Sequence, residues 1–461
     1  MTGNPPEIDI KEAYNAVTLD PLQSGDPRYV DCSPARGEDG DIVRTLSWRI
    51  DSSKAPMTQL ISGHRGCGKS TELLRLAKNL EDKKFLVVYF AADEDLDVGD
   101  LEYTDLLVAI IKRLERSLAE KDIQIDPRLM NGILMWFAEV VYESSDEEDI
   151  TKTLDTEFEL GLKAPAPLPI IARMFAKITG QIRTGQKSRK NIRSKLEPQV
   201  YQLIARINEF IQAALPDIKR KGFRDIVLII DNLDRIVLRV LDAETGRTTH
   251  DALYLEHAEQ LKALDAYMVY TVPISMFYSP KGTQLTGGAF PSSAILPMIK
   301  VQESNGKPCK MGINLLCRVA EERVDVRHLF ARDVVEYLAD KSGGVLRDFV
   351  RLLAYTIELA QASGGKIPIG QIIAERAFLR LINEYGRMVP DEHFNLLAEV
   401  ARNKKVRNDS RHQAMLYSLS VLEYMNGTRW YDVHPAIREL SDFQNAASKL
   451  SKSDDDRSSS G

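Results

Sequence analysis

The order of apolar and polar positions along the chain predicts parallel strands that alternate with helices. Short, nearly continuous apolar runs bounded by polar residues are typical of strands buried on both faces. Such runs occupy residues 85–92, 225–231 and 268–273, and a short strand is predicted at residues 58–62. Between the strands at 58–62 and 85–92, residues 70–80 carry leucines at helical spacing, so strand, helix and strand follow one another as in a βαβ unit. The pattern predicts an α/β core with a parallel sheet.

Helical periodicity continues on both sides of these strands. Amphipathic segments lie at residues 103–119, 196–214, 331–341, 345–361 and 371–384. The last three follow the final predicted strand and predict a small helical subdomain. Residues 281–297 contain glycine and proline and are predicted to form a loop.

The C-terminal part of the chain has a different pattern. Helices are predicted near residues 393–402 and 411–419, and two short segments of alternating residues flank Asn426 and Gly427. An Asn-Gly pair between such segments is the strongest short-range signal for a β-hairpin. Helices followed by a hairpin predict a winged helix-turn-helix. The Ser- and Asp-rich residues 447–461 are predicted to be a disordered tail.

Charged residues occur in blocks between the second and third predicted strands. Residues 143–159 hold eight acidic side chains against one lysine, and residues 183–195 hold six basic side chains and no acidic one. Blocks of one sign usually lie in solvent. We therefore predict that residues from about 120 to 198 form a charged insertion between core strands.

The strongest chemical signal follows the first predicted strand. It has the spacing G-x-x-x-x-G-K-[ST], in which glycines let the backbone wrap closely and point its N–H groups at phosphate oxygens where a helix begins. The residues assigned to this phosphate-binding loop, or P-loop, are Gly63, His64, Arg65, Gly66, Cys67, Gly68, Lys69, Ser70 and Thr71. Lys69 is expected to reach the β- and γ-phosphates, Ser70 to bind Mg²⁺ and Thr71 to lie near the α-phosphate.

The second part of a P-loop site is an acidic residue at the end of a buried strand, where it holds Mg²⁺ directly or through water. Asp231 has this position. Many P-loop ATPases place a glutamate next to it to polarise the attacking water, but here the residue is Asn232, whose amide cannot accept a proton. Asp234, Glu94 or Asp95 would then have to assist, or hydrolysis would be slow, which suits a switch better than a motor. The catalytic candidates are Lys69, Asp231, Asn232 and Asp234.

Composition and charge exclude several classes of protein. With 44% hydrophobic residues among 461, the chain can bury real cores, and a net charge of -6 argues against a protein coated in nucleic acid. The four cysteines lack the paired spacing of zinc or redox sites. The N-terminus lacks the regions of a secretory signal. No apolar run approaches the roughly 20 residues that a membrane span requires. We expect a cytoplasmic protein without membrane segments.

Together these motifs resemble those of a nucleotide-binding family. The P-loop, the stretch 230–235, the strand end at 271–273 and the Gly-Gly-Val-Leu-Arg stretch at 343–347 are similar to AAA+-related ATPases of the STAND type. They are similar also to origin-recognition initiator ATPases and KAP-type nucleotidases. The resemblance covers residues 57–445 and implies a P-loop parallel-sheet core of the ASCE type, an α-helical lid and a C-terminal winged helix-turn-helix.

The resemblance also implies ligands and roles. It implies ATP with Mg²⁺, a preference for adenine, and ATP-gated assembly. Thr271 or Ser275 would sense the γ-phosphate, and Arg347 would reach it from the lid. The predicted parts are a lead-in (1–56), the core (57–300), the lid (301–388), the winged helix (389–446) and the tail (447–461).

Basic residues outside the P-loop suggest possible partners. An arginine from a neighbouring subunit could neutralise charge in the site, and the candidates are Arg189, Arg193 and Arg235. The basic residues of 183–195 and 402–411 could contact DNA phosphates. The expected partners are further copies of the chain and a protein effector. DNA is a further candidate partner, through these two basic segments.

Three functions are compatible with these features. The first is an ATP-binding, slowly hydrolysing switch that controls assembly or a partner, which the resemblance associates with bacterial conflict and antiviral defence systems. The second is a DNA-binding loader similar to replication initiators, and salt-dependent DNA affinity separates it from the first. The third is a nucleotide-binding scaffold that does not hydrolyse, motivated by Asn232.

Overall fold

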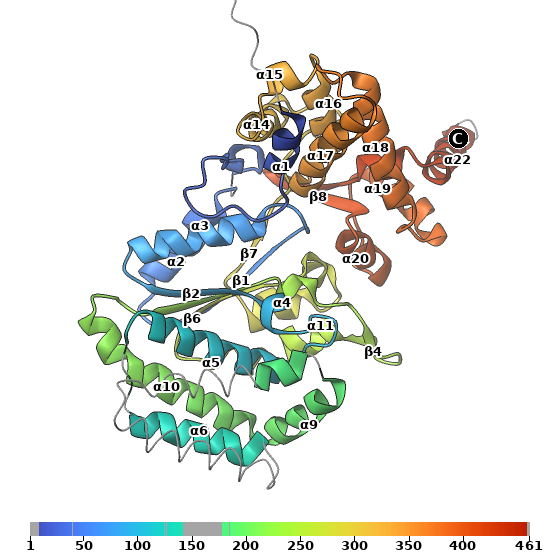
Figure 1. Ribbon diagram of the computed structural model, residues 1–461. Helices are drawn as coiled ribbons and strands as arrows, with labels where there is room; N and C mark the ends of the chain where they lie inside the picture. The colour runs from blue at the N-terminus through green and yellow to red at the C-terminus, as the bar shows by residue number, and fades with distance from the viewer. Residues whose placement is uncertain are drawn as a thin grey trace, which may run out of the picture.

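Five parallel strands form the centre of the molecule (Figure 1). The computed structural model describes residues 9–38, 40–123, 125, 127–141, 178–183 and 185–458. The strands are β1 (Thr58–Gly63), β2 (Leu86–Ala91), β3 (Ile226–Asp231), β6 (Tyr267–Thr271) and β7 (Ser293–Leu296). They lie in the order β2-β3-β6-β1-β7, and each neighbouring pair is parallel. Because β6 separates β1 from β3, the sheet has the predicted ASCE-type arrangement.

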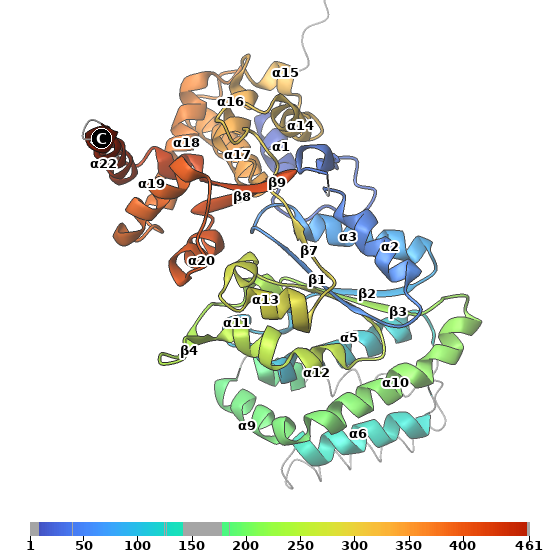
Figure 2. The same cartoon turned by 180° about the vertical axis from the view of Figure 1, so that it is seen from behind.

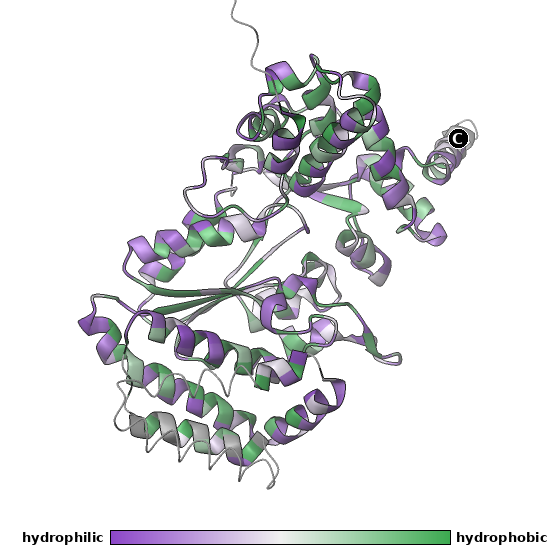
Figure 3. Ribbon diagram, in the orientation of Figure 1, coloured by the Kyte–Doolittle hydropathy of each residue, from purple (hydrophilic) through white to green (hydrophobic). Residues whose placement is uncertain are grey.

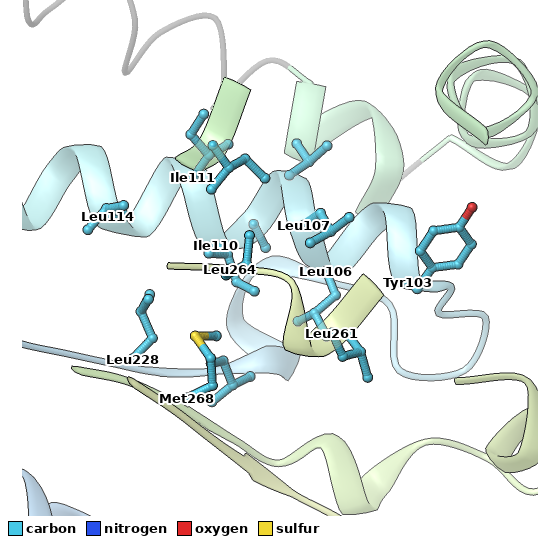
Figure 4. Close-up of a cluster of buried hydrophobic side chains, with 14 of the residues drawn as sticks. Tyr103, Leu106, Leu107, Ile110, Ile111, Leu114, Leu228, Leu261, Leu264 and Met268 are labelled. Atoms are coloured by element: carbon cyan, nitrogen blue, oxygen red, sulfur yellow. The ribbon is translucent and has the colours of Figure 1, made fainter. Parts of the chain in front are cut away.

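Helices cover both faces of this sheet. On one face lie α2 (Ile42–Ser52) and α3 (Lys69–Asp82), and on the other lie α5 (Tyr103–Glu120) and α10 (Val200–Arg220). Along α5 and α10, hydrophobic and hydrophilic stretches alternate at helical spacing (Figure 3). The buried side chains where α5 meets the strands are shown in Figure 4 and include Leu107, Ile110, Leu114, Leu228 and Met268.

The insertion between β2 and β3 adds a second helical layer outside α5 and α10. Its described helices include α6 (Pro127–Val141) and α9 (Gln186–Leu196). The acidic residues 143–159 lie outside the described residues. The insertion leaves the sheet after β2 and returns to it at β3, as predicted.

Helix α9 corrects, for two arginines, the expectation that residues 183–195 form a solvated basic block, whereas Arg183, Lys187 and Lys190 are exposed as expected. Arg189 and Arg193 are only 5% and 6% exposed. Arg189 pairs with Asp97 at 2.8 Å, and Arg193 pairs with Asp105 at 2.5 Å. The two arginines are four residues apart, so both lie on the side of α9 that faces the acidic segment after β2. Charge-block reasoning failed here because the opposite charges come from a distant part of the sequence.

The segment 281–297, predicted as a loop, contains regular structure. Two short helical turns, α13 (Gly282–Gln284) and η6 (Leu285–Ala289), precede β7, which extends the sheet beside β1. Three of the four residues of β7 are only partly buried. An edge strand of this kind lacks the continuous apolar run that revealed β2, β3 and β6.

A helical lid follows β7. It includes α14 (Lys310–Glu321), α16 (Val334–Lys341), α17 (Leu346–Ala362) and α18 (Gln371–Gly386), of which only α14 was not predicted. From the other end of the chain, α1 (Ile10–Ala16) packs on α17. Part of the lead-in is therefore attached to the lid.

The C-terminal part is the predicted winged helix. Helices α19 (Phe394–Asn403) and α20 (Ser410–Tyr417) precede the antiparallel strands β8 (Val421–Asn426) and β9 (Thr428–Val433). Gly427, with a φ of 67°, lies in the tight turn between the strands. In the view from behind, β8 and β9 lie between the lid and the core (Figure 2).

The hairpin formed by β8 and β9 packs against the core. Leu422, Tyr424 and Trp430 share one buried cluster with Ile61 of β1 and Leu296 of β7. The rings of Tyr424 and Trp430 stack with centroids 4.5 Å apart. The winged helix is therefore docked on the P-loop domain.

The prediction of a disordered tail at 447–461 is corrected for the residues up to 458. Helix α22 (Ser441–Ser458) begins before this segment and continues into it. Phe443, Ala446 and Leu450 recur at helical spacing in the apolar cluster of the lid and winged helix, and α22 packs on α19. This packing explains a helix in a polar segment. Among all described residues, no helix is both long and apolar enough to cross a membrane.

Candidate nucleotide-binding site

The P-loop joins the end of β1 to the start of α3. Gly63, Gly66 and Gly68 have φ values of 148°, 78° and 102°. A Cβ atom on Gly63 would lie 2.7 Å from the carbonyl oxygen of Leu296, and one on Gly66 would lie 2.7 Å from the Cβ of Arg347. All three glycines have positive φ, which disfavours other residues, and at Gly63 and Gly66 the neighbouring atoms also leave no space for a side chain.

Lys69 occupies the first position of α3 and is 5% exposed. Its Nζ donates to the carbonyl oxygens of Gly63 and His64, at 2.8 and 3.1 Å, and forms an ion pair with Asp234 at 2.9 Å. Burial opposes the charge, but the carboxylate of Asp234 raises the pKa of Lys69 overall. The ammonium group is therefore charged and held at the loop by an acidic residue.

Asp231 ends β3 and is 1% exposed. Its carboxylate accepts hydrogen bonds from Tyr89 Oη and from the amide of Asn232, at 2.9 and 2.7 Å, and also from the side chain of Ser70. Burial, together with the nearby charge of Asp234, raises the pKa of Asp231. A divalent cation would relieve this unfavourable burial of negative charge.

The residues at this point fit Mg²⁺. Among the described residues there is no group of three or more His, Cys, Asp or Glu side chains that could hold a metal ion. The contact between Ser70 and Asp231 instead offers two oxygen ligands side by side. Mg²⁺ commonly uses one or two protein ligands and completes its shell with phosphate and water oxygens.

Asn232 follows Asp231 in the left-handed conformation, with a φ of 62°. Its Nδ2 donates to Asp93 Oδ1 at 2.8 Å, and Arg235 pairs with the other oxygen of Asp93 at 2.6 Å. Sequence reasoning considered the next two acidic residues and missed Asp93. Register could have suggested it, because Ala91 of β2 pairs with Asp231, so the residues that follow the two strands are neighbours.

The acidic residues proposed in place of Asp93 are engaged elsewhere. Glu94 pairs with Arg113 at 2.7 Å, and Asp95 pairs with Lys112 at 2.8 Å and with Arg113. Asp234 is bound to Lys69, as described above. Asp93 is thus the carboxylate that the structure brings to Asn232.

Thr271 lies at the end of β6 and is fully buried. Its hydroxyl accepts from the amide of Leu233 at 2.9 Å and donates to the carbonyl oxygen of Ile230 at 3.4 Å. Ser275 is also buried, and its hydroxyl has no hydrogen-bond partner among the described residues. Thr271 therefore braces the turn after β3, and a sensing role for either hydroxyl stays a prediction.

Arg347 extends into the cleft from the start of α17. Its backbone amide donates to the carbonyl oxygen of Gly66 at 3.0 Å, and its side chain lines the same cleft as Arg65 and Arg235. Burial in the cleft and the charge of Arg235 lower the pKa of Arg347. Cations crowded together in this way favour an anionic ligand.

Two of the three arginines considered as donors to the nucleotide site of a neighbouring subunit do not fit that role. Arg189 and Arg193 are buried in ion pairs within their own chain and are not exposed to a neighbouring subunit. Arg235 lines the cleft of its own chain and pairs with Asp93.

One wall of the cleft comes from the N-terminal segment, which the sequence did not reveal as part of the site. Residues 18–22 and 28–32 contribute most of this wall. The amide of Leu22 donates to Thr71 Oγ1 at 3.2 Å, and Arg36 donates to the carbonyl oxygen of Cys67 at 2.6 Å. These contacts join segments that no local sequence pattern connects.

Two P-loop side chains bind the winged helix directly. His64 Nε2 accepts a hydrogen bond from the amide of Glu423 in β8 at 2.8 Å. Arg65 donates to Tyr417 Oη of α20 and lies over the Tyr417 ring, 4.4 Å from its centroid. Burial, aided by the charge of Lys69, lowers the pKa of His64 to about 3, so the imidazole is a neutral acceptor. We call these two interactions the loop–wing contact.

The fold and the site define a P-loop α/β protein with a helical lid and a winged helix docked on the loop. The sequence matches no family model and no curated protein. Solved structures to which it is similar are the ORC2 protein of Aeropyrum pernix in ADPNP and ADP complexes (11% identity, 95% of this chain and 98% of that chain, TM-score 0.40), Cdc6p of Pyrobaculum aerophilum (13%, 95% and 98%, TM-score 0.38) and a Walker-type ATPase of Pyrococcus abyssi (11%, 91% and 98%, TM-score 0.41).

Proposed function

We propose that the chain binds ATP with Mg²⁺ and hydrolyses it slowly, as an AAA+-related regulatory switch. The loop–wing contact carries this proposal. His64 and Arg65 lie between the glycine and the lysine that would hold the phosphates, yet their side chains bind β8 and α20. A ligand that reorganises the P-loop must therefore act on the winged helix.

Phosphate binding would compete with interactions present in this structure. Lys69 is paired with Asp234, and a triphosphate offers it a second anionic partner. Arg65, bound to Tyr417, lines the same cleft. If Arg65 turns toward the phosphates, Tyr417 loses one of its two hydrogen-bond partners and the winged helix loses a contact with the core.

The remaining parts of the site support binding of a purine nucleotide. When bound, Mg²⁺ neutralises phosphate charge, and Ser70 and Asp231 would hold it. Leu22, Val30 and Val350 add apolar surface to the cleft. Adenine is proposed over guanine because of the resemblance to AAA+ proteins and because the guanine-specific Asn-Lys-x-Asp motif is absent from the sequence.

We propose that the moving units are the core (57–300), the lid (301–388) and the winged helix (389–446). The output would be self-assembly or control of a protein effector in the cytoplasm. The resemblance to STAND proteins motivates a place in a bacterial conflict or antiviral defence system.

A DNA-binding loader is the second candidate. Lys405, in the loop between α19 and α20, and Arg411, in the first turn of α20, are exposed, and both belong to the segment predicted to contact phosphates. Lys404 and Arg407 of the same loop are paired with Asp432 and Glu399, at 2.7 and 2.8 Å. Absence of duplex DNA binding at low salt, with and without ATP, would reject this candidate.

Phosphate release from Mg²⁺-ATP tests the proposed function. We expect slow turnover by the parent protein and none by Lys69→Ala. Tight ATP binding without turnover in the parent would instead support the scaffold that does not hydrolyse. Mass photometry with and without ATP tests assembly in the same samples.

A further inference from the structure

Asn232 is held in one orientation by its surroundings. It lies directly after Asp231, in a left-handed conformation that asparagine tolerates better than most residues. Its Nδ2 donates to Asp93 Oδ1 at 2.8 Å. Arg235 binds the other oxygen of Asp93 at 2.6 Å, so the carboxylate is fixed from both sides.

This orientation determines what Asn232 presents to the cleft. A carboxamide has one donating end and one accepting end. A carboxylate can only accept when ionised, so Asp93 selects the orientation in which Nδ2 faces Asp93 and Oδ1 is left for other partners. Asn232 lines the nucleotide cleft next to Asp234 and Lys69.

We propose that Asp93 is a positioning residue for ATP hydrolysis, acting through Asn232; this inference rests on the proposed ATPase function. Asn232 Oδ1 accepts a hydrogen bond from the attacking water. The water oxygen forms a bond to the γ-phosphorus, and the bond from that phosphorus to the bridging oxygen breaks. The electron pair stays on ADP, and the water proton moves to a γ-phosphoryl oxygen, giving dihydrogen phosphate.

The geometry favours Asp93 over the other carboxylates. Glu94 and Asp95 point to Arg113 and Lys112, and Asp234 is bound to Lys69. Because the amide cannot take the proton, orientation of the water is the contribution left to Asn232. That contribution depends on the carboxylate that fixes the amide.

Three variants test the inference. Asp93→Asn replaces the carboxylate by a group that can either donate or accept, so Asn232 loses its fixed orientation. Glu94→Gln is the matched control, because it removes a carboxylate one residue away that is paired with Arg113. The double variant Asp93→Asn with Asn232→Asp exchanges the two groups and keeps one donor facing one acceptor. Aspartate also tolerates the left-handed conformation.

For Asp93→Asn we expect kcat to fall by about ten- to a hundredfold, the range for a misplaced reacting group. KM, the Kd of a fluorescent ATP analogue and the midpoint of thermal unfolding should stay at the parent values. The exchanged double variant should regain most of the lost kcat, and Glu94→Gln should match the parent.

Two results would overturn the inference alone. One is an active parent with the same kcat in Asp93→Asn, and the other is a fall in kcat that is matched by weaker ATP binding or by a lower unfolding temperature. A parent without turnover would overturn the proposed ATPase function, and the inference with it.

Discussion

At the scale of single residues, the site is organised by buried charges. Lys69 and Asp234 form an ion pair with side chains 5% and 7% exposed. A buried pair contributes little net stability, but loss of one partner leaves an uncompensated charge. The P-loop is therefore poised to accept another anion beside Lys69.

The first prediction concerns this pair. Asp234→Ala should lower the free energy of unfolding of the nucleotide-free protein by about 3–5 kcal/mol, because Lys69 is left buried without its carboxylate. Added Mg²⁺-ATP should restore more stability to the variant than to the parent, because phosphates replace the missing anion. Urea unfolding with and without ATP measures both effects.

The matched control is Asp82→Ala. Lys78 and Asp82 form an exposed pair at 2.8 Å, and such pairs contribute only about 0–1 kcal/mol. Equal losses of stability in the two variants would contradict the role assigned to Asp234.

The second prediction concerns the pH dependence of stability. Burial raises the pKa of Glu423 from 4.5 to about 7, and among the described residues its carboxyl oxygens have no hydrogen-bond partner. At a pH between these two values, the carboxyl of Glu423 keeps its proton in the folded state and has lost it in the unfolded state. The free energy of unfolding therefore falls as pH rises from about 4.5 to about 7 and then levels off.

Glu423→Gln should remove this component. Urea unfolding at pH 5 and pH 8 measures this. From pH 5 to pH 8, the parent should lose about 3 kcal/mol of unfolding free energy relative to Glu423→Gln. A difference that is the same at both pH values would show that the carboxyl of Glu423 is already charged when folded.

Sequence predicts residues whose spacing the chemistry itself imposes. Phosphate wrapping requires the glycines and Lys69 at fixed separations, so the P-loop was found directly. The partners of these residues were not predictable, since Arg65 and Tyr417 are brought together only by the tertiary fold. Asp93 was missed because the turn after β2, and not the sequence pattern, decides which of three consecutive acidic residues faces β3.

At the scale of secondary-structure elements, the connection between α16 and α17 joins two lid helices and also contacts the winged helix. Gly343 and Gly344 have positive φ values of 62° and 78°. The carbonyl oxygen of Gly343 accepts from Tyr424 Oη at 2.7 Å. A Cβ atom on Gly344 would lie 1.7 Å from the carbonyl oxygen of Ile299. Neither Gly343 nor Gly344 has room for a side chain.

The third prediction compares two glycines with similar backbone conformations. Gly344→Ala should destabilise the protein by more than the roughly 1–2 kcal/mol cost of a left-handed alanine, because the added methyl group overlaps Ile299. Gly427→Ala, with a φ of 67° and open space around it, should show only that backbone cost. Thermal unfolding of the two variants tests this, and equal effects would contradict the packing argument.

The elements differ in how well the sequence predicts them. α3, α5 and α17 follow the predicted bounds closely because each has one continuous apolar face. β7 was missed because an edge strand of four residues carries no distinctive run. α9 and α22 were misjudged because their polar composition hides the few residues that pack, and only the neighbouring elements reveal them.

At the scale of the whole molecule, three parts of the chain meet at the P-loop. The N-terminal segment, the lid and the winged helix each contact it, through Arg36, Arg347 and Glu423. Helix α20 faces the core through Tyr417, which contacts Arg65 and the carbonyl oxygen of Ile236. The order of domains was predictable from the sequence, but their closure around the loop was not.

The fourth prediction tests this closure. Tyr417→Phe keeps the ring beneath Arg65 but removes the hydroxyl that binds Arg65 and the carbonyl oxygen of Ile236. We expect slower release of a fluorescent nucleotide, because nucleotide binding no longer has to break the hydrogen bond between Arg65 and Tyr417. Tyr201→Phe on α10, 77% exposed and distant from the loop, is the control and should leave the release rate unchanged.

The central claim is that nucleotide in the P-loop controls the winged helix, and hydrogen–deuterium exchange tests it most directly. The amide of Glu423 donates to His64, so its exchange reports on the loop–wing contact. Mg²⁺-ATP should speed exchange in residues 410–433 of the parent and leave Lys69→Ala unchanged. If ATP binds to the parent and exchange in residues 410–433 is as slow as without ATP, the nucleotide does not control the winged helix.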